Sequence, residues 1–134
     1  MLPISDEQLI NAAQAVLNPR KLPEFYVGDV GCAVLSLNDE VFTGTCIGGE
    51  YGVCAEQSAL SNLIMKGEPR VKRLVAVWRN EQGELHALPP CARCRAFLLS
   101  LSQENRNTEI VLGRDHVSML KDLLPLEGWH AEKL

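Results

Sequence analysis

Three cysteines and one glutamate form the most informative pattern in this 134-residue sequence. Cys54-Ala55-Glu56 is followed further along the chain by Pro90-Cys91-Ala92-Arg93-Cys94. Three thiolates can fill three of the four tetrahedral positions around a zinc ion, which leaves the fourth position for water. A carboxylate two residues from the first thiol can reach that water without binding the metal. The pattern therefore predicts a hydrolytic Zn²⁺ site with Cys54, Cys91 and Cys94 as ligands and Glu56 as the catalytic residue.

The chemistry expected of such a site is acid–base catalysis on activated water. Zinc lowers the pKa of a bound water from 15.7 to about 7. Glu56 would take up the proton released and later donate it, which is worth ~10²–10⁴-fold in rate. Three thiolates leave the zinc site with a net charge of about −1, which Arg93 or Arg95 could offset by hydrogen bonding to a sulfur. Spacing alone does not choose between these two arginines.

Other interpretations of the cysteines explain less of the pattern. A structural zinc site needs a fourth protein ligand, and the available donors, Cys32, Cys46 and His86, lack the usual paired spacing. A redox pair at Cys91 and Cys94 leaves Cys54 without a role. A domain that holds zinc and only binds a partner remains an alternative to an enzyme.

Composition narrows the class of protein. A hydrophobic content of 46% fits a folded globular domain, and a formal charge of −4 argues against a sequence-independent nucleic-acid binder. The opening residues include Asp6 and Glu7 and do not resemble a signal peptide, and no run is long enough to span a membrane. Five cysteines, an odd number, favour free thiols in a reducing compartment, so we expect a cytoplasmic protein. Cys32 and Cys46 lie in apolar runs and are expected to be small buried side chains.

Hydrophobic periodicity predicts helices alternating with strands. We expect a first helix capped by Ser5 and ended by Pro19, and further helices over 54–66, 91–102 and 117–124. Strands are expected over 30–37, 41–47, 74–78, 84–88 and 109–112. This order predicts an α/β fold, a three-layer α/β/α sandwich with a mixed central sheet, in a single domain over 1–134. Both zinc motifs fall at helix starts, where helix dipoles present partial positive charge.

These motifs resemble the small, three-cysteine zinc cytidine deaminase family, which includes blasticidin S deaminase. Val30-Gly31-Cys32-Ala33 is similar to the family's first strand, and Phe42-Thr43-Gly44 to its second. The second zinc motif, continued to Arg95, resembles the family's Pro-Cys-Gly-x-Cys-Arg. Leu123-Leu124-Pro125 and Trp129 also have counterparts near the C-terminus.

The resemblance implies a cytidine deaminase-like fold and a specific reaction. That reaction is hydrolytic deamination of a cytosine-type nucleoside, such as cytidine, deoxycytidine or blasticidin S, with release of ammonia. Its implied cofactor is Zn²⁺, and its implied assembly is a homo-oligomer, a tetramer or a dimer. The resemblance also favours Arg95 as the arginine beside the sulfurs and the Pro89 carbonyl as acceptor for the leaving amine.

Departures from the family pattern concern the sugar. Cys46-Ile47-Gly48 stands where cytidine deaminases carry the Asn-x-Glu that holds ribose, and Gln57 replaces an arginine that often follows the catalytic glutamate. Substrate contacts are expected among five residues, Ala55, Pro89, Glu50, Tyr51 and Phe25, of which Glu50 and Tyr51 are the candidates to replace the ribose contacts. The substrate is therefore expected to be a small aminopyrimidine, with another amino-heterocycle as the alternative and no nucleic acid. Trp129 could cover the active site or a subunit interface.

Overall fold

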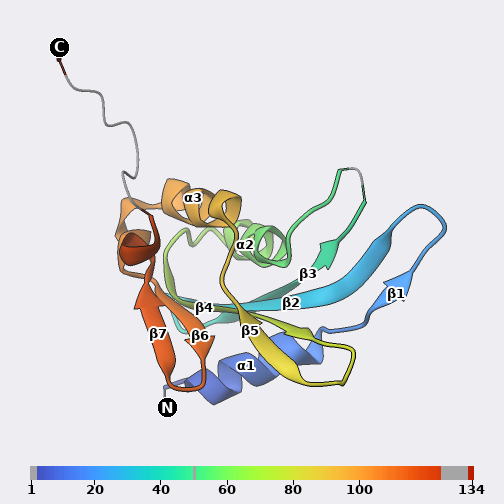
Figure 1. Cartoon of the computed structure of the whole chain (residues 1–134). Coiled ribbons are helices and arrows are strands. Elements are labelled where there is room, and N and C mark those ends of the chain that lie inside the picture. The colour runs from blue at the N-terminus through green and yellow to red at the C-terminus, as the bar shows by residue number, and fades with distance from the viewer. Residues whose placement is uncertain (1–2, 50, 125–132) are drawn as a thin grey trace.

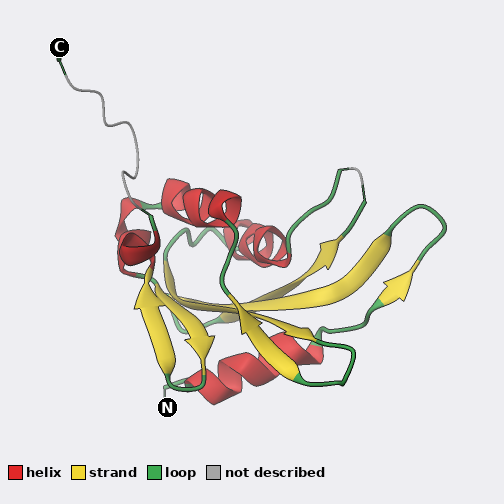
Figure 2. Ribbon diagram, viewed as in Figure 1, coloured by secondary structure: helices red, strands yellow, loops and turns green. Residues whose placement is uncertain are grey.

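The computed structural model describes residues 3–49, 51–124 and 133–134. In this part of the chain the elements form three layers (Figure 1, Figure 2). The helices are α1 (Asp6–Ala15), α2 (Ala55–Met65) and α3 (Ala92–Leu101), with short 3₁₀ helices at Gln103–Asn107 and Leu120–Leu123. The strands are β1 (Arg20–Lys21), β2 (Tyr26–Ser36), β3 (Val41–Ile47), β4 (Val71–Arg79), β5 (Leu85–Leu88), β6 (Glu109–Gly113) and β7 (His116–Met119). Helices α2 and α3 cover one face of the sheet and α1 covers the other, which confirms the predicted sandwich.

The central sheet is mixed, as predicted. Strand β2 pairs antiparallel with β3 on one side and with β4 on the other. Strand β4 then pairs in parallel with β6, and β6 pairs antiparallel with β7. The short strands β1 and β5 extend the sheet beside β2 and β4. Strands β2 and β4 lie inside the sheet, and their central stretches 32–35 and 74–77 are buried on both faces, which explains why these stretches are continuously apolar.

The first helix begins where its sequence predicts. The Ser5 hydroxyl accepts a hydrogen bond from the Gln8 backbone N–H at 3.1 Å, and the Gln8 side-chain oxygen accepts one from the Ser5 N–H at 2.8 Å. This reciprocal arrangement satisfies two backbone donors that have no partner within the helix. Leu9, Ile10 and Ala13 then face the sheet and are buried.

Two hydrophobic cores lie on opposite faces of the sheet. The core beneath α1 includes Leu9, Ala33 and Val77, and the core beneath α2 and α3 includes Leu60, Leu98 and Ile110. Two glycines allow the helices to approach. A Cβ at Gly31 would meet the backbone carbonyl of Ala13 in α1, and a Cβ at Gly44 would meet the backbone nitrogen of Ala59 in α2. Gly44 therefore sets how closely α2, with the first zinc motif at its start, lies on the sheet.

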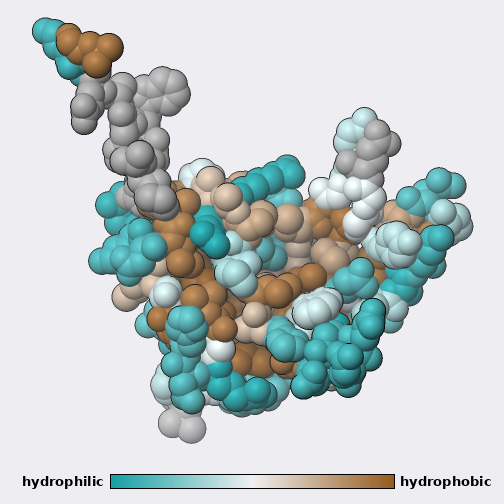
Figure 3. All heavy atoms as spheres, viewed as in Figure 1, coloured by the Kyte–Doolittle hydropathy of each residue, from teal (hydrophilic) through white to brown (hydrophobic). Residues whose placement is uncertain are grey.

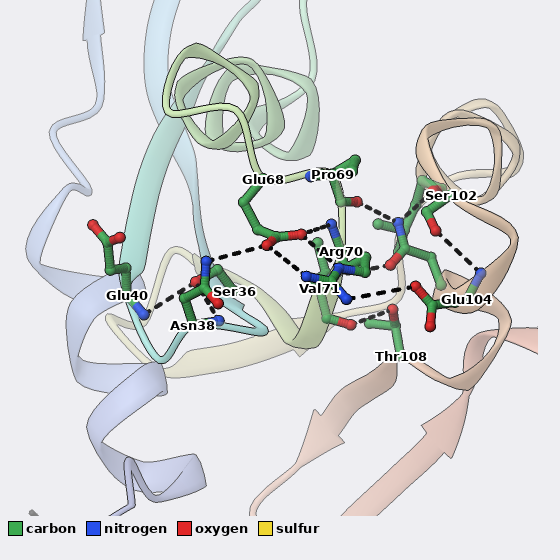
Figure 4. Close-up of polar contacts among 12 residues, drawn as sticks. Ser36, Asn38, Glu40, Glu68, Pro69, Arg70, Val71, Ser102, Glu104 and Thr108 are labelled. Carbon is green, nitrogen blue, oxygen red and sulfur yellow. Dashed lines mark hydrogen bonds and ion pairs between the residues drawn. The ribbon is translucent and has the colours of Figure 1, made fainter.

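A buried polar cluster holds α3 to the start of β4. The Asn105 side-chain oxygen accepts a hydrogen bond from the Val71 N–H at 2.8 Å. Its amide nitrogen donates to the carbonyls of Pro69 and Leu98, each at 2.9 Å. The Thr108 hydroxyl donates to the Val71 carbonyl at 2.7 Å (Figure 4). Asn105 is 1% exposed, and its own three hydrogen bonds, to Val71, Pro69 and Leu98, satisfy its side-chain amide inside the protein.

Some predicted boundaries were wrong. The region 117–124 is not one helix, because a turn at 114–115 folds β7 against β6 and a 3₁₀ helix follows. Strand β2 begins at Tyr26 rather than at 30, and β1 was not predicted. In the face shown in Figure 3, hydrophobic residues gather over the middle of the molecule and hydrophilic residues lie around its rim. Among the described helices, none has the length and apolar character needed to cross a bilayer.

Candidate metal centre

Two helix starts carry the three cysteines. Cys54 is the N-cap of α2, and Cys91 is the N-cap of α3. Cys94 lies in the first turn of α3 and is buried. The Cys54 N–H donates to the side-chain oxygen of Gln57 at 3.2 Å, so Gln57 helps to hold this helix start. Helices α2 and α3 lie on the same face of the sheet (Figure 1), and the sulfurs of their N-cap residues Cys54 and Cys91 lie 3.9 Å apart, so the positive dipole ends of both helices meet at one site.

The sulfur geometry suits a zinc ion. The Cys54 and Cys91 sulfurs lie 3.9 Å apart, and the three sulfurs of Cys54, Cys91 and Cys94 all lie within 4.8 Å of one another. Tetrahedral zinc with Zn–S bonds of about 2.3 Å requires sulfurs about 3.8 Å apart. Within 3–49, 51–124 and 133–134, no further Cys, His, Asp or Glu joins this group. That result argues against a closed structural site, which needs a fourth protein ligand.

The thiols have different electrostatic environments. Burial, the largest effect, raises the pKa of Cys94, and the carboxylate of Glu56 adds to the rise. Burial also raises the pKa of Cys54. At Cys91 burial again favours the thiol, but hydrogen bonds from the backbone and thiol of Cys94 and from Cys54 lower its pKa overall. Without a cation the chain therefore disfavours three thiolates at this site, so a metal is the natural counter-charge.

Glu56 lies beside the sulfurs in a cavity of about 230 Å³. The cavity is lined by Val30, Cys46, Cys54, Ala55, Glu56, Ala76, Leu88, Pro89 and Cys91. Glu56 is only 6% exposed, and burial raises the pKa of its carboxyl group. The glutamate and two of the three cysteines that the sequence singles out therefore share one cavity, although they come from two separate helices.

The predicted substrate contacts divide into two groups. Ala55 and Pro89 line the cavity with Glu56. Tyr51 is 89% exposed, and neither it nor Phe25 is among the lining residues. Phe25 instead lies next to the loop at Gly49. Glu50 and Trp129 lie outside the described residues.

Four lining residues were not predicted as part of the site. Val30, Cys46, Ala76 and Leu88 come from β2, β3, β4 and β5, and their sequence patterns indicate only buried strands. Cys46 was expected to be a small buried side chain, but it is only partly buried and lines the cavity. The strand pairing brings these residues together, and no local signal in the sequence identifies them.

Arg95 contacts the backbone rather than forming the expected hydrogen bond to sulfur. Its Nε donates to the Pro90 carbonyl at 2.7 Å, and its Nη1 donates to the Leu123 carbonyl at 3.1 Å. Within the described part of the chain, the Arg95 side chain makes these two hydrogen bonds and none to a cysteine sulfur. The guanidinium therefore links the loop before Cys91 to the 3₁₀ helix at Leu120–Leu123.

Three sulfurs that lack a fourth protein ligand in the described part of the chain, two of them in one cavity with a buried carboxylate, are typical of a zinc-dependent hydrolase. A model of the cytidine and deoxycytidylate deaminase zinc-binding region matches residues 3–111, and the chain belongs to this family. Zn²⁺ is its cofactor, and it is a hydrolase that acts on C–N bonds of small molecules.

Solved structures support the same fold. The chain is similar to the cytidine deaminase of Burkholderia pseudomallei, with 24% identity, a TM-score of 0.70, and coverage of 92% of this chain and 99% of that one. It is 27% identical to the cytidine deaminase of Mycobacterium tuberculosis, with a TM-score of 0.62 and coverage of 89% of each chain. The cytidine deaminase of Bacillus anthracis is 18% identical, with a TM-score of 0.70 and coverage of 90% of this chain and 87% of that one. The fold matches in each case over most of both chains.

Proposed function

We propose that the protein hydrolyses the exocyclic amine of a cytosine-type nucleoside or analogue, such as cytidine, deoxycytidine or blasticidin S, and releases ammonia. The observation that carries the proposal is the position of Glu56, which lines the same cavity as Cys54 and Cys91. The solved relatives named above are cytidine deaminases, which supports this substrate class. Another aminopyrimidine or amino-heterocycle is the alternative substrate, and a non-catalytic zinc-binding module is the alternative function.

Each group in the cavity has a part in this reaction. Cys54, Cys91 and Cys94 hold the zinc, which when bound acts as a Lewis acid that makes water easier to deprotonate. Glu56 accepts one proton from water and delivers it to the ring nitrogen, then takes the second proton from the same oxygen and passes it to the departing amine. The water oxygen becomes the new carbonyl oxygen of the ring as ammonia leaves. Ala55 and Pro89 both line the cavity, and in this proposal Ala55 and the Pro89 carbonyl contact the reacting end of the substrate.

Arg95 acts in this proposal through the backbone. Its guanidinium holds the Pro90 carbonyl, immediately before Cys91, and so fixes the approach to the second zinc motif. Its positive charge also offsets part of the negative charge of the thiolates.

The surroundings of the enzyme follow from the same features. We expect a single domain over 1–134 that acts in the cytoplasm, since the described cysteines are all free. A homo-oligomer, a tetramer or a dimer, is expected from the family. The net charge of −4 disfavours nucleic acid as a substrate.

Ammonia release by the zinc-loaded protein tests the proposal. The substrates are cytidine, deoxycytidine, cytosine and blasticidin S, and the key variant is Glu56→Gln. We expect turnover of at least one of these amines, and a loss of ~10²–10⁴-fold in Glu56→Gln with zinc still bound. Glu81→Gln, a change at an exposed turn residue, is the matched control. Near-normal turnover by Glu56→Gln with zinc bound would exclude the role given to this residue.

A further inference from the structure

The chemical character of the active-site cavity walls indicates which substituent the substrate can carry on its ring, away from the reacting amine. We propose that Cys46 determines specificity, and that the cavity prefers a cytosine-type ring with no N1 substituent or an apolar one over a ring that carries a hydroxylated sugar. This inference rests on the proposed function, because it concerns the substrate of the same site.

Apolar side chains form the walls away from the sulfurs. Val30, Cys46, Ala76 and Leu88 line the cavity and belong to, or pack against, the hydrophobic core beneath α2 and α3. Among the described lining residues, Glu56 is the one with a charged side chain. The protein therefore offers strong polar recognition at the reacting end and apolar contact elsewhere.

An irregularity in the sheet produces this wall. Val27 pairs with Ile47 and Gly31 pairs with Thr45, so residues 28–30 of β2 stand opposite the single residue Cys46 of β3. Bulges of this kind interrupt the ladder of backbone hydrogen bonds and redirect side chains, often beside active sites. Here the bulge brings Val30 and Cys46 to the same cavity.

The polar side-chain atoms at the end of β3 form hydrogen bonds with the backbone of the bulge in β2. The Val30 N–H donates to the Cys46 sulfur at 3.3 Å, and the Thr45 hydroxyl donates to the Val30 carbonyl at 3.1 Å. The Thr45 hydroxyl proton is therefore committed to the backbone. The thiol of Cys46 is a weak donor and already serves as an acceptor. Thr45 is not among the lining residues, so of the two side chains only the weakly bonding Cys46 thiol faces the substrate.

The loop that follows β3 does not supply the missing polar contacts in its described residues. Tyr51 is 89% exposed, and Gly48, Gly49, Gly52 and Val53 are not among the lining residues. The cavity volume of about 230 Å³ lies below the range of about 300–1,000 Å³ typical of drug-sized ligands. A single ring with a small substituent suits a site of this size.

A sugar hydroxyl that faces the apolar wall at Val30 and Cys46 would lose its hydrogen bond to water. Leaving one polar group without a partner weakens binding by roughly 5- to 150-fold. For zinc-loaded wild type we expect kcat/KM for 1-methylcytosine to exceed that for cytidine by about tenfold or more. A ratio of one or less would overturn the proposed preference.

Two substitutions test the part played by Cys46. Cys46→Ala keeps an apolar wall, so we expect the ratio of 1-methylcytosine to cytidine to stay within about twofold of wild type. Cys46→Ser keeps an acceptor for the Val30 N–H and adds a stronger donor, so the ratio should fall at least about threefold toward cytidine. Equal ratios in the two variants would show that the residue does not set specificity, even if both lose stability.

Binding to wild type separates this inference from the proposed function. Calorimetry on zinc-loaded protein should show tighter binding of 1-methylcytosine than of cytidine, whether or not either compound is turned over. Tighter binding of 1-methylcytosine without ammonia release would support the proposed preference for an apolar substituent and reject the deaminase assignment. Ammonia release, together with tighter binding of cytidine, would support the deaminase assignment and reject the proposed preference for an apolar substituent.

Discussion

Asn105 offers a quantitative test of how the second zinc helix is anchored. Its side chain makes three hydrogen bonds, to the backbone of Val71, Pro69 and Leu98, while being 1% exposed. Each bond contributes about 1 kcal/mol net, and a buried backbone group left without a partner costs about 1–3 kcal/mol. Asn105→Ala should therefore lower the free energy of unfolding by about 3–5 kcal/mol. For a chain of this length, such a change lowers Tm by roughly 10–20 °C.

Asn107→Ala is the matched control for this measurement. Asn107 lies in the same 3₁₀ helix, Gln103–Asn107, and is exposed. Surface changes of this kind usually alter stability by no more than about 0.5 kcal/mol. Urea unfolding followed by circular dichroism gives both free energies. If Asn105→Ala and Asn107→Ala lay within about 1 kcal/mol of each other, the reasoning about buried polar satisfaction would be refuted.

Three further perturbations address the approach of α2, the support of the zinc loop and the response to acid. Gly44→Ala should destabilise the protein by about 1–3 kcal/mol, because the new Cβ meets the α2 backbone. Gly48→Ala is the control and should not destabilise the protein, because its Cβ would lie 3.5 Å from the Tyr26 Cβ, an ordinary contact distance. Equal melting temperatures of the two variants would contradict this prediction. Arg95→Ala should weaken zinc binding, since it loses the hydrogen bonds to the Pro90 and Leu123 carbonyls. Competition with a chelator measures the zinc affinity, with Arg93→Ala as the control. Unchanged affinity in Arg95→Ala would show that these two hydrogen bonds do not support the zinc site. The bond to Arg70 lowers the Glu68 pKa from 4.5 to about 2, so this pair stabilises the fold above pH 4.5 and ceases to do so as pH falls toward 2 (Figure 4). Melting curves across that window should show a flatter pH dependence in Glu68→Gln than in wild type, and parallel curves would argue against it.

Local sequence signals predicted the helices that carry the chemistry. Ser5 and Gln8 form the cap of α1, and α2 and α3 run within a residue of their predicted ends. Capping and 3.6-residue periodicity act over a few residues, so they can be read from the sequence. The metal-ligand spacing was similarly informative, because the chemistry of zinc restricts the residue types that can bind it.

Features that depend on pairing between distant segments could not be predicted. The region 117–124 has a helix-like pattern, yet the turn at 114–115 places Val117 opposite Val111 of β6. Trp78 continues the apolar run of β4, yet its position at the end of that strand leaves it 37% exposed and close to His86. The cavity wall at Cys46 arises from the bulge in β2, which is a property of the β2–β3 register and not of either strand alone.

Zinc content of single cysteine variants tests the central claim most directly. Purified Cys54→Ser, Cys91→Ser, Cys94→Ser and Cys46→Ser would be dialysed against the same chelator and their bound zinc measured. We predict about one zinc per chain in wild type and Cys46→Ser, and a marked loss in each of the other three. Cys46 is the matched control because it lines the same cavity but lies outside the three-sulfur group. Full zinc content in any of the three ligand variants, or loss of zinc in Cys46→Ser, would contradict the proposed metal centre.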